Sequence, residues 1–279
     1  MQLFLISGLS GSGKSVALKV LEDSGYYCVD NLPAELLATL VAHLHASGYH
    51  KIAVSIDVRS ANSAPHVPLL LEELKARGVQ VHVIFLDAQS DTLVKRFSES
   101  RRLHPLNNGV LTLPECVQLE RDLLANISDI GHRIDTSDIS ANALRAWIKQ
   151  FVAVDHANLT VLFESFGFKH GIPLDADFVF DVRCLPNPHY NPALQALTGR
   201  DLPVIAFLDD TPDAQAMAGD IQTFITRWLP NFIADNRSYF TVAIGCTGGQ
   251  HRSVYLVEKL AKNFAATQQV LIRHRELHA

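Results

Sequence analysis

Apolar runs of strand length alternate with helical patterns through residues 1–154. The run Val81-His82-Val83-Ile84-Phe85-Leu86 is apolar at nearly every position, which is typical of a strand covered on both faces. Strands that alternate with helices in this way predict βαβ units and a parallel sheet. The expected strands are 3–7, 26–30, 52–58, 81–86 and 133–135, and the expected helices are 15–23, 35–46, 69–77, 92–100, 114–128 and 141–154.

The alternation resumes after a short polar stretch, 155–158, which we interpret as a linker. A second α/β domain is therefore expected over residues 159–279. Between its elements, the segment 185–192 contains three prolines, and these exclude regular structure there. The expected strands of this domain are 159–163, 178–182, 204–208 and 241–245, and the expected helices are 214–229 and 252–265.

A glycine-rich run joins the first expected strand to the first expected helix and fits the pattern GxxxxGK[ST]. Its glycines let the backbone curl so that successive N–H groups point at a phosphate, and the helix adds its positive N-terminal end. Lys14 is expected to reach the β- and γ-phosphates, and the Ser15 hydroxyl to hold Mg²⁺. The predicted ATP-binding residues are Gly8, Leu9, Ser10, Gly11, Ser12, Gly13, Lys14 and Ser15.

This P-loop refines the fold class to α/β with an N-terminal P-loop, kinase-like parallel sheet that has helices on both faces. Phosphoryl transfer also requires a carboxylate near the metal, at the end of a buried strand. Asp57 is the preferred candidate, with Lys14, for a catalytic role, and Asp87 is the alternative. Either aspartate can instead cap the turn that follows it.

Two further features stand beside this expected nucleotide site. Arg101-Arg102 follows a helix and either closes over triphosphate charge or forms a solvated helix end. Asp30 ends the second strand, where it faces a phosphate acceptor or lies in a turn beside Pro33.

The second domain contains a separate candidate anion site at Cys246-Thr247-Gly248-Gly249-Gln250-His251-Arg252. A strand ends, a loop of small residues follows, and a helix begins with the arginine. The spacing Cys-x5-Arg is that of the phosphate loop in tyrosine-phosphatase-like folds, so phosphate binding is expected here. The cysteine is either a nucleophile or a buried structural residue beside a glycine turn. His189 and Asp181 can line the same pocket.

The composition narrows the setting and the partners. A net charge of −5 argues against general adhesion to nucleic acid, so RNA contact requires a local patch. The four cysteines form no CxxC pair, which argues against zinc and a disulfide framework and favours the reducing cytoplasm. No apolar stretch reaches the roughly 18 residues of a membrane span. Near the end of the chain lie the basic residues Lys259, Lys262, Arg273 and Arg275, with His274 and His278. They are expected on a helix and the tail after it, as an RNA-facing patch or a solvated helix face.

Seven segments, in order along nearly the whole chain, resemble the bacterial RapZ (YvcJ-like) nucleotide-binding protein family. They are GLSGSGKSVAL (8–18), YYCVDNLP (26–33), SIDVRS (55–60), SRRLHPL (100–106), FESFGFKHGIP (163–173), DFVFDVRCLPNPHY (177–190) and AIGCTGGQHRSVY (243–255).

The resemblance implies binding and hydrolysis of ATP and GTP, with a guanine-nucleotide segment at Asp57, Val58, Arg59 and Ser60. It also implies an RNase adapter that presents a small regulatory RNA to RNase E and controls glucosamine-6-phosphate synthase. The matching sugar-phosphate contacts for glucosamine-6-phosphate are Asp181, His189, Cys246, Thr247, Gly248, His251 and Arg252. The enterobacterial members end in a lysine- and arginine-rich tail, from which the segment 273–279 departs.

The leading hypothesis from the sequence is a regulatory, slow nucleoside triphosphatase that senses a phosphorylated metabolite. A homo-oligomer is expected of such an adapter. Two alternatives remain open: a P-loop small-molecule kinase, and a phosphatase that depends on Cys246.

Overall fold

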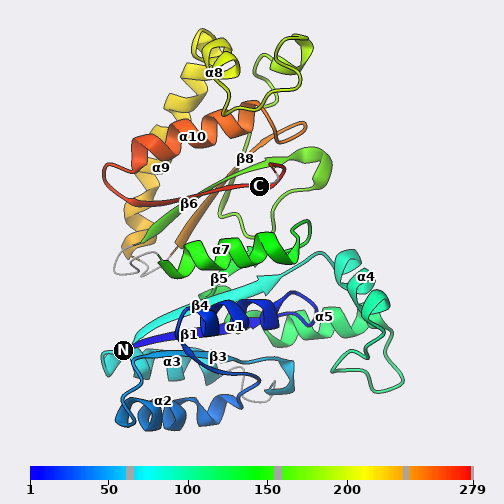
Figure 1. Cartoon of the computed structure of the whole chain (residues 1–279), viewed down its shortest axis with the longest axis vertical. Helices are drawn as coiled ribbons and strands as arrows, with labels where there is room; N and C mark the ends of the chain where they lie inside the picture. Colours follow the sequence, from blue (N-terminus) through cyan, green and yellow to red (C-terminus); the bar gives the residue numbers. More distant parts are fainter. Residues whose placement is uncertain (61–65, 154–158, 235–238, 278–279) are drawn as a thin grey trace. The chain divides into compact units, whose positions relative to one another are not determined.

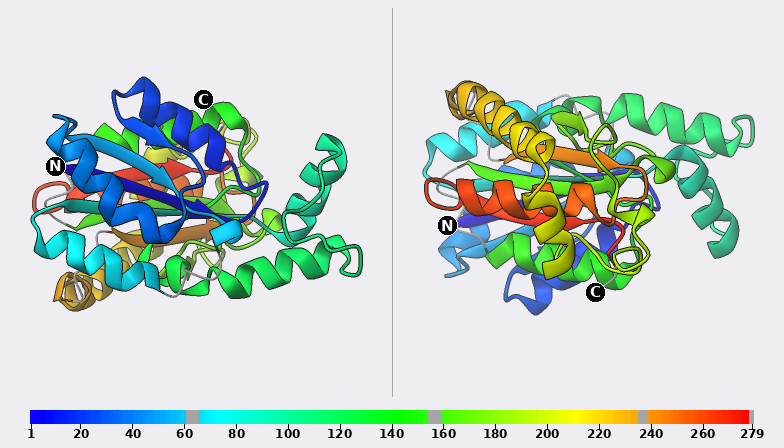
Figure 2. Two further views of the ribbon diagram at one scale, coloured as in Figure 1. Left: turned by 90° about the horizontal axis from the view of Figure 1, so that it is seen from below. Right: turned by 90° about the horizontal axis from the view of Figure 1, so that it is seen from above.

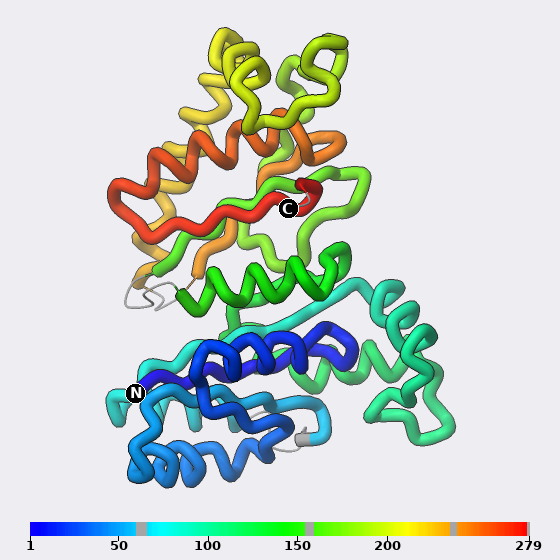
Figure 3. The backbone as a smooth tube through the Cα atoms, in the orientation of Figure 1, coloured from blue at the N-terminus to red at the C-terminus, as the bar shows by residue number. Residues whose placement is uncertain are grey.

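A computed structural model describes residues 1–60, 66–153, 159–234 and 239–277. The chain divides into two compact units, Met1–Ala153 and Val154–Ala279. Figure 3 traces the backbone through both. The expected linker, 155–158, lies outside the described residues. The predicted α/β class is confirmed, because each unit is built on its own parallel sheet.

The first unit has a five-stranded sheet in the order β2-β3-β1-β4-β5, and every neighbouring pair is parallel. The central strand, β1, ends directly in the glycine loop. The carboxyl ends of its two neighbours, β3 and β4, therefore lie beside that loop. The strands are β1 (Gln2–Gly8), β2 (Tyr27–Val29), β3 (Lys51–Ser55), β4 (Gln80–Asp87) and β5 (His132–Asp135).

Helices cover both faces of this sheet, with α1 and α7 on one and α2, α3 and α6 on the other (Figure 1). The segment formed by α4 and α5 projects from the end of the unit (Figure 2). The helices are α1 (Lys14–Asp23), α2 (Leu37–Ala46), α3 (Val67–Ala76), α4 (Ser90–Ser100), α5 (Leu113–Leu123), α6 (Ala125–Ile130) and α7 (Ala141–Ala153), and short 3-10 turns lie at Ala34–Leu36 and Val58–Ser60.

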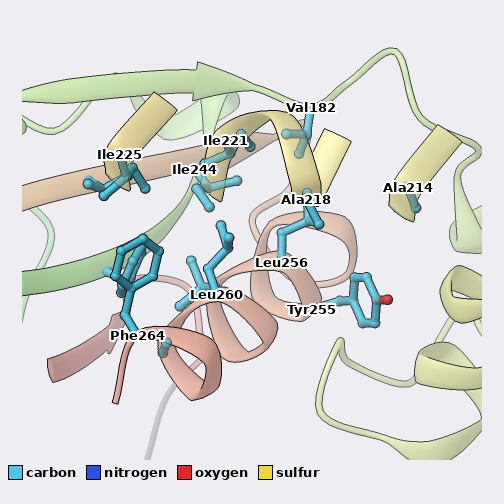
Figure 4. Close-up of a cluster of buried hydrophobic side chains, with 14 of the residues drawn as sticks. Val182, Ala214, Ala218, Ile221, Ile225, Ile244, Tyr255, Leu256, Leu260 and Phe264 are labelled. Carbon is cyan, nitrogen blue, oxygen red and sulfur yellow. The ribbon is translucent and has the colours of Figure 1, made fainter. Parts of the chain in front are cut away.

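The second unit has a four-stranded parallel sheet in the order β7-β8-β6-β9. Its core packs α9 and α10 against the strands, and Figure 4 shows Ile221 and Ile225 from α9 beside Leu256 and Leu260 from α10. The strands are β6 (Thr160–Gly167), β7 (Phe178–Asp181), β8 (Tyr239–Cys246) and β9 (Gln269–His274), and the helices are α8 (Leu202–Asp209), α9 (Pro212–Ala234) and α10 (Arg252–Phe264), with 3-10 turns at Phe168–His170 and Pro188–Tyr190.

Two expectations for the second unit are wrong. The run 204–208 is not a strand but belongs to α8, which begins after Asp201 and has a proline in its first turn. Residues 269–274 are not a tail after a helix but form β9, which pairs with β6 along its whole length. Among the described residues, no helix combines the length and the apolar character needed to cross a membrane.

Candidate functional site

The glycine loop is a sharp, tightly packed turn between β1 and α1. Gly8 has φ 139°, and a Cβ there would lie 2.2 Å from the Leu86 carbonyl oxygen, so the start of the loop requires glycine. Gly13 has φ 109° and immediately precedes the first residue of α1. Leu9 is buried against Leu93 and Val117, which anchors the loop to α4 and α5. The loop is therefore held in shape by its neighbours.

Two polar side chains fix the carbonyl groups of the loop. The guanidinium of Arg96 donates to the Gly11 carbonyl at 3.1 Å, and the hydroxyl of Thr136 donates to the Ser12 carbonyl at 3.0 Å. These two hydrogen bonds hold the carbonyls of Gly11 and Ser12 in place. A loop of this kind binds an anion through its backbone N–H groups.

Lys14 is the first residue of α1, and its ammonium donates to the Gly8 carbonyl at 2.6 Å. Burial lowers the pKa of Lys14, while the negative charges of Glu120, Asp57 and Asp30 oppose that shift. Three carboxylates thus act electrostatically on this one ammonium. Ser15 is exposed in the first turn of the same helix.

The two candidate metal carboxylates have different surroundings. Asp87 is 1% exposed, and both its oxygens are bound to Arg121, at 2.7 and 2.8 Å, with Arg133 at 2.8 Å from one of them. Asp57 accepts a backbone N–H from Arg59 at 2.9 Å, and the Arg59 side chain is 3.7 Å away. Asp87 is therefore committed to an ion-pair network, whereas Asp57, as far as residues 1–60 and 66–153 show, retains an oxygen for a cation or its water. The hydroxyl of Ser15 and the carboxylate of Asp57 are the oxygen donors that Mg²⁺ prefers, so these residues fit the ion.

The remaining sequence candidates of this unit lie around the same edge of the sheet. Asp30 is exposed and accepts a hydrogen bond of 2.5 Å from the Ser55 hydroxyl. Arg101 ends α4 in the left-handed region with φ 52°, and Arg101 and Arg102 are exposed on the projecting segment. Val58 and Arg59 lie in the 3-10 turn after β3, with Val58 buried and the Arg59 side chain 61% exposed.

The loop after β8 in the second unit is also compact. A Cβ on Gly249 would meet the Gly167 nitrogen at 2.6 Å, and its φ is 72°. The Cys246 sulfur lies 3.2 Å from the Ser253 hydroxyl and accepts the Gly249 N–H at 3.2 Å. Burial alone would raise the pKa of Cys246, but hydrogen bonds from Ser253, Gly249 and His251 outweigh it, and the pKa lies below its ordinary value. The loop therefore stabilises a negative charge on the sulfur.

Arg252 begins α10 and is buried beneath this loop. One guanidinium nitrogen donates to the carbonyls of Arg183 and Leu185, both at 2.8 Å, and the other donates to the Thr247 hydroxyl at 3.3 Å. Arg252 thus ties the segment after β7 to the loop after β8. These acceptors are neutral, while the side-chain hydrogen bond from Arg183 and the charge of Arg252 both help to lower the pKa of the Asp181 carboxyl, so the guanidinium of Arg252 favours an anion nearby.

The other predicted sugar-phosphate contacts gather at the same end of the sheet. His189 and His251 have ring centroids 6.1 Å apart, with His189 exposed and His251 buried against the Leu194 carbonyl. Asp181 ends β7 and is paired at 2.6 Å with its neighbour Arg183. Thr247 is exposed and Gly248 is half-buried on the loop itself.

The four basic residues near the end do not form a common surface. Arg273 and Arg275 are buried, and Arg273 is paired with Asp175 at 3.1 Å and with Glu164 at 3.5 Å. Lys259 is bound to Asp209 at 3.0 Å, while Lys262 is exposed. The expectation of a solvent-facing patch made by these four is wrong, because Arg273 in β9 and Arg275 directly after it are both buried.

Several residues at the two sites were not predicted from the sequence. Glu120 and Arg96 contact the P-loop from α5 and α4, and nothing in their local sequence indicates it. Lys169 lies beside the second loop, where its N–H donates to the Thr247 carbonyl at 3.3 Å. Arg183 lies over the Phe168 ring at 4.0 Å. The FGFKHG segment was the available sequence signal for Lys169. Its position beside the second loop could not be predicted, because it depends on the parallel pairing of β6 with β8.

The fold and the site together define a nucleotide-binding protein with a P-loop in its N-terminal unit. A RapZ-like N-terminal domain matches residues 1–156, and a RapZ C-terminal domain matches residues 159–278. The chain belongs to the RapZ family.

Similar proteins agree with this assignment along the whole chain. A nucleotide-binding protein of Thiobacillus denitrificans is 60% identical over 277 residues, covering 99% of this chain and 100% of that protein. One of Methylobacillus flagellatus is 59% identical over 278 residues, covering 99% of each.

Solved structures resemble a part of the chain. The YorR protein of Bacillus subtilis, in complex with phosphorylated GDP, is 18% identical with a TM-score of 0.39, and the match covers 55% of this chain and 97% of that one. Shikimate kinase of Acinetobacter baumannii, in complex with shikimate, is 18% identical with a TM-score of 0.36, covering 54% of this chain and 92% of that one.

Proposed function

We propose that the first unit binds ATP and GTP with Mg²⁺ and hydrolyses them slowly, as part of a regulatory protein. The observation that carries this is the P-loop with Lys14 at its mouth and Asp57 free to serve the ion. Lys14 would neutralise the β- and γ-phosphates, while Ser15 and Asp57 would hold the Mg²⁺. The turn of residues 57–60 is the proposed guanine-nucleotide segment.

Calorimetric titration of the full chain with MgATP and MgGTP tests this assignment. Lys14→Ala is expected to abolish both the binding of these nucleotides and their hydrolysis to release phosphate, because the ammonium is the charge that contacts the phosphates. Lys19→Ala, an exposed lysine on the same helix, is the matched control and is expected to bind as the unchanged protein does. Binding by the Lys14 variant equal to that control would refute the proposal.

For the second unit, we infer that the loop of residues 246–252 senses glucosamine-6-phosphate. Supporting this are the buried charge of Arg252, the lowered pKa of Cys246 and the neighbouring side chains of Asp181, His189 and His251. A phosphate would be held by backbone N–H groups and positive charge, and the hydroxyl and amino groups of the sugar by the other side chains. Titration with glucosamine-6-phosphate, with fructose-6-phosphate as comparison, tests this. Equal affinity for both sugars would argue against a dedicated sensor.

The adapter role is a separate proposal: a small regulatory RNA is bound and presented to RNase E, with the protein as a homo-oligomer. Of the basic residues considered for RNA contact, Lys262 is the exposed one. A gel-shift assay is expected to show binding of structured RNA that weakens with added salt. Lys262→Ala should weaken it further, and the absence of any shift at low salt would exclude RNA binding.

A small-molecule kinase is the second candidate function, favoured by Asp30. Its carboxylate is oriented by Ser55 at 2.5 Å, and its charge acts on Lys14. A carboxylate held there can accept the proton of an acceptor hydroxyl. Phosphorylated product from a panel of hydroxylated metabolites, lost in Asp30→Asn, would establish a kinase.

A phosphatase acting through Cys246 is the remaining alternative, favoured by its lowered pKa. Turnover of a phosphate monoester, lost in Cys246→Ser, would establish it. Unchanged turnover in that variant would exclude covalent chemistry at the thiol.

A further inference from the structure

Glu120 on α5 is a carboxylate of the protein itself that is bound to the phosphate loop. It is 0% exposed. Its Oε2 accepts the Ser10 backbone N–H at 2.9 Å, and its Oε1 accepts the Ser10 hydroxyl at 2.8 Å. The N–H groups of such a loop form an anion site, so one of them already holds an anion that belongs to the protein.

His104 completes the hydrogen bonding of this carboxylate without cancelling its charge. Its Nε2 lies 3.0 Å from Oε2 of Glu120, and its Nδ1 accepts the Leu106 N–H at 3.2 Å. A ring nitrogen that accepts carries no proton, so the proton of the neutral ring is on Nε2, which donates to Glu120. The carboxylate therefore accepts from three neutral donors and keeps its full negative charge.

Lys14 is the cation whose field reaches this carboxylate. Burial would raise the pKa of Glu120, but the hydrogen bonds from His104 and Ser10 and the charge of Lys14 outweigh it, and the pKa is lowered. Glu120 is in turn the first of the charges that support the protonated form of Lys14. In a P-loop, this lysine reaches the β- and γ-phosphates. Glu120 and the terminal phosphate of a nucleotide would thus both interact with the same positive charge, that of Lys14.

We propose that Glu120 sets the preference of this site for phosphate chain length, because its buried negative charge opposes the terminal phosphate of a nucleoside triphosphate. The site then holds a nucleoside diphosphate more tightly, relative to the triphosphate, than it would without Glu120. This inference rests on the proposed binding of ATP and GTP at the same loop.

The test is the ratio of two dissociation constants, measured by calorimetry on the full chain with MgADP and with the Mg²⁺ complex of a non-hydrolysable ATP analogue. Glu120→Gln removes the charge and keeps an oxygen that accepts from Ser10. It is expected to strengthen binding of the analogue relative to MgADP by about tenfold, the size expected when one unit charge ceases to act on another in a partly buried site. Glu120→Met, which is uncharged and of similar volume, provides the same test if the glutamine variant does not fold.

His104→Gln is the matched control, since the glutamine amide donates to Glu120 and leaves the carboxylate charged. Its ratio is expected to match that of the unchanged protein. An unchanged ratio in both Glu120 variants would overturn the inference while leaving nucleotide binding intact. Loss of both ligands by folded Glu120 variants would also overturn it, since Glu120 would then build the loop instead of opposing the phosphate. An unchanged protein that binds neither ligand would refute the nucleotide proposal itself.

Discussion

Three buried carboxylates close to the P-loop have different surroundings, and these determine their roles. Within the described parts of the chain, Asp87 is neutralised by two arginines, Glu120 accepts hydrogen bonds from neutral donors, and Asp57 accepts one backbone N–H and lies 3.7 Å from a guanidinium. A carboxylate that is fully paired serves the fold, because removing one partner of a buried pair is costly. A carboxylate with an oxygen left over is available to a cation or its water.

Replacement by asparagine should affect stability at Asp87 and nucleotide binding at Asp57. Asp87→Asn is expected to lower the free energy of unfolding by about 2–3 kcal/mol, less than for a fully buried pair because both arginines are partly exposed. Asp57→Asn should change stability by less than about 1 kcal/mol and weaken Mg²⁺-dependent nucleotide binding by about tenfold. Urea unfolding and titration with and without Mg²⁺ measure the two effects. The reverse pattern would make Asp87 the carboxylate that serves the metal.

Cys246 predicts a pH dependence of stability. Its folded pKa is lowered relative to the ordinary thiol value of about 8.5. The folded state therefore favours the thiolate, and the stabilisation is fully present above about pH 8.5 and lost as the pH falls through the folded pKa. Cys246→Ser should remove this rise in urea stability with pH, whereas Cys184→Ser, at an exposed cysteine, should keep it. Parallel pH curves for the two variants would contradict the assignment.

The sequence revealed residues whose role depends on a local motif and missed those whose partners are remote. Lys14 and Ser15 follow from their spacing in the glycine loop. Glu120 could not be predicted, because its partner Ser10 is 110 positions away and α5 reaches the loop only through the fold. The different surroundings of Asp57 and Asp87 likewise could not be predicted, because the arginines that bind Asp87 come from α5 and β5.

At the scale of elements, β9 shows how a charged segment can form an edge strand and bury an arginine. Its sequence mixes polar and apolar residues and does not read as a buried strand. Pairing with β6 places Arg273 beside Glu164, and Arg273 also forms an ion pair with Asp175. The three side chains make a buried ion-pair cluster. The strand predicted at 204–208, within α8, was wrong for another reason. Apolar runs of that length fit a strand and a buried helix turn equally well.

Arg273 and Lys262 distinguish an interior charge from a surface one. Arg273→Ala leaves two buried carboxylates without this cation and is expected to lower the free energy of unfolding by about 3–5 kcal/mol. Lys262→Ala removes an exposed charge and should change it by no more than about 0.5 kcal/mol. Urea unfolding of both variants measures these changes in the free energy of unfolding. A mild effect of Arg273→Ala would mean that β9 is not held by this cluster.

At the scale of the whole molecule, the chain consists of two units, each with its own sheet and its own hydrophobic core. The P-loop lies in the first and the Cys246 loop in the second. Ligands that bind the native state stabilise the part of the structure that contains their site. Because the contacts described for each site come from residues of one unit, a ligand for that site is expected to stabilise that unit.

Calorimetric unfolding of the full chain is therefore expected to show two transitions. MgATP at about a hundred times its dissociation constant should stabilise one by about 2.7 kcal/mol, which raises its midpoint by about 5–10 °C. Glucosamine-6-phosphate should raise the other. Lys14→Ala should remove the first shift and leave the second, and His189→Ala, at an exposed histidine, should weaken only the second. A single transition that both ligands raise equally would mean that the two units unfold as one cooperative body, and nucleotide and sugar phosphate would then be coupled through it.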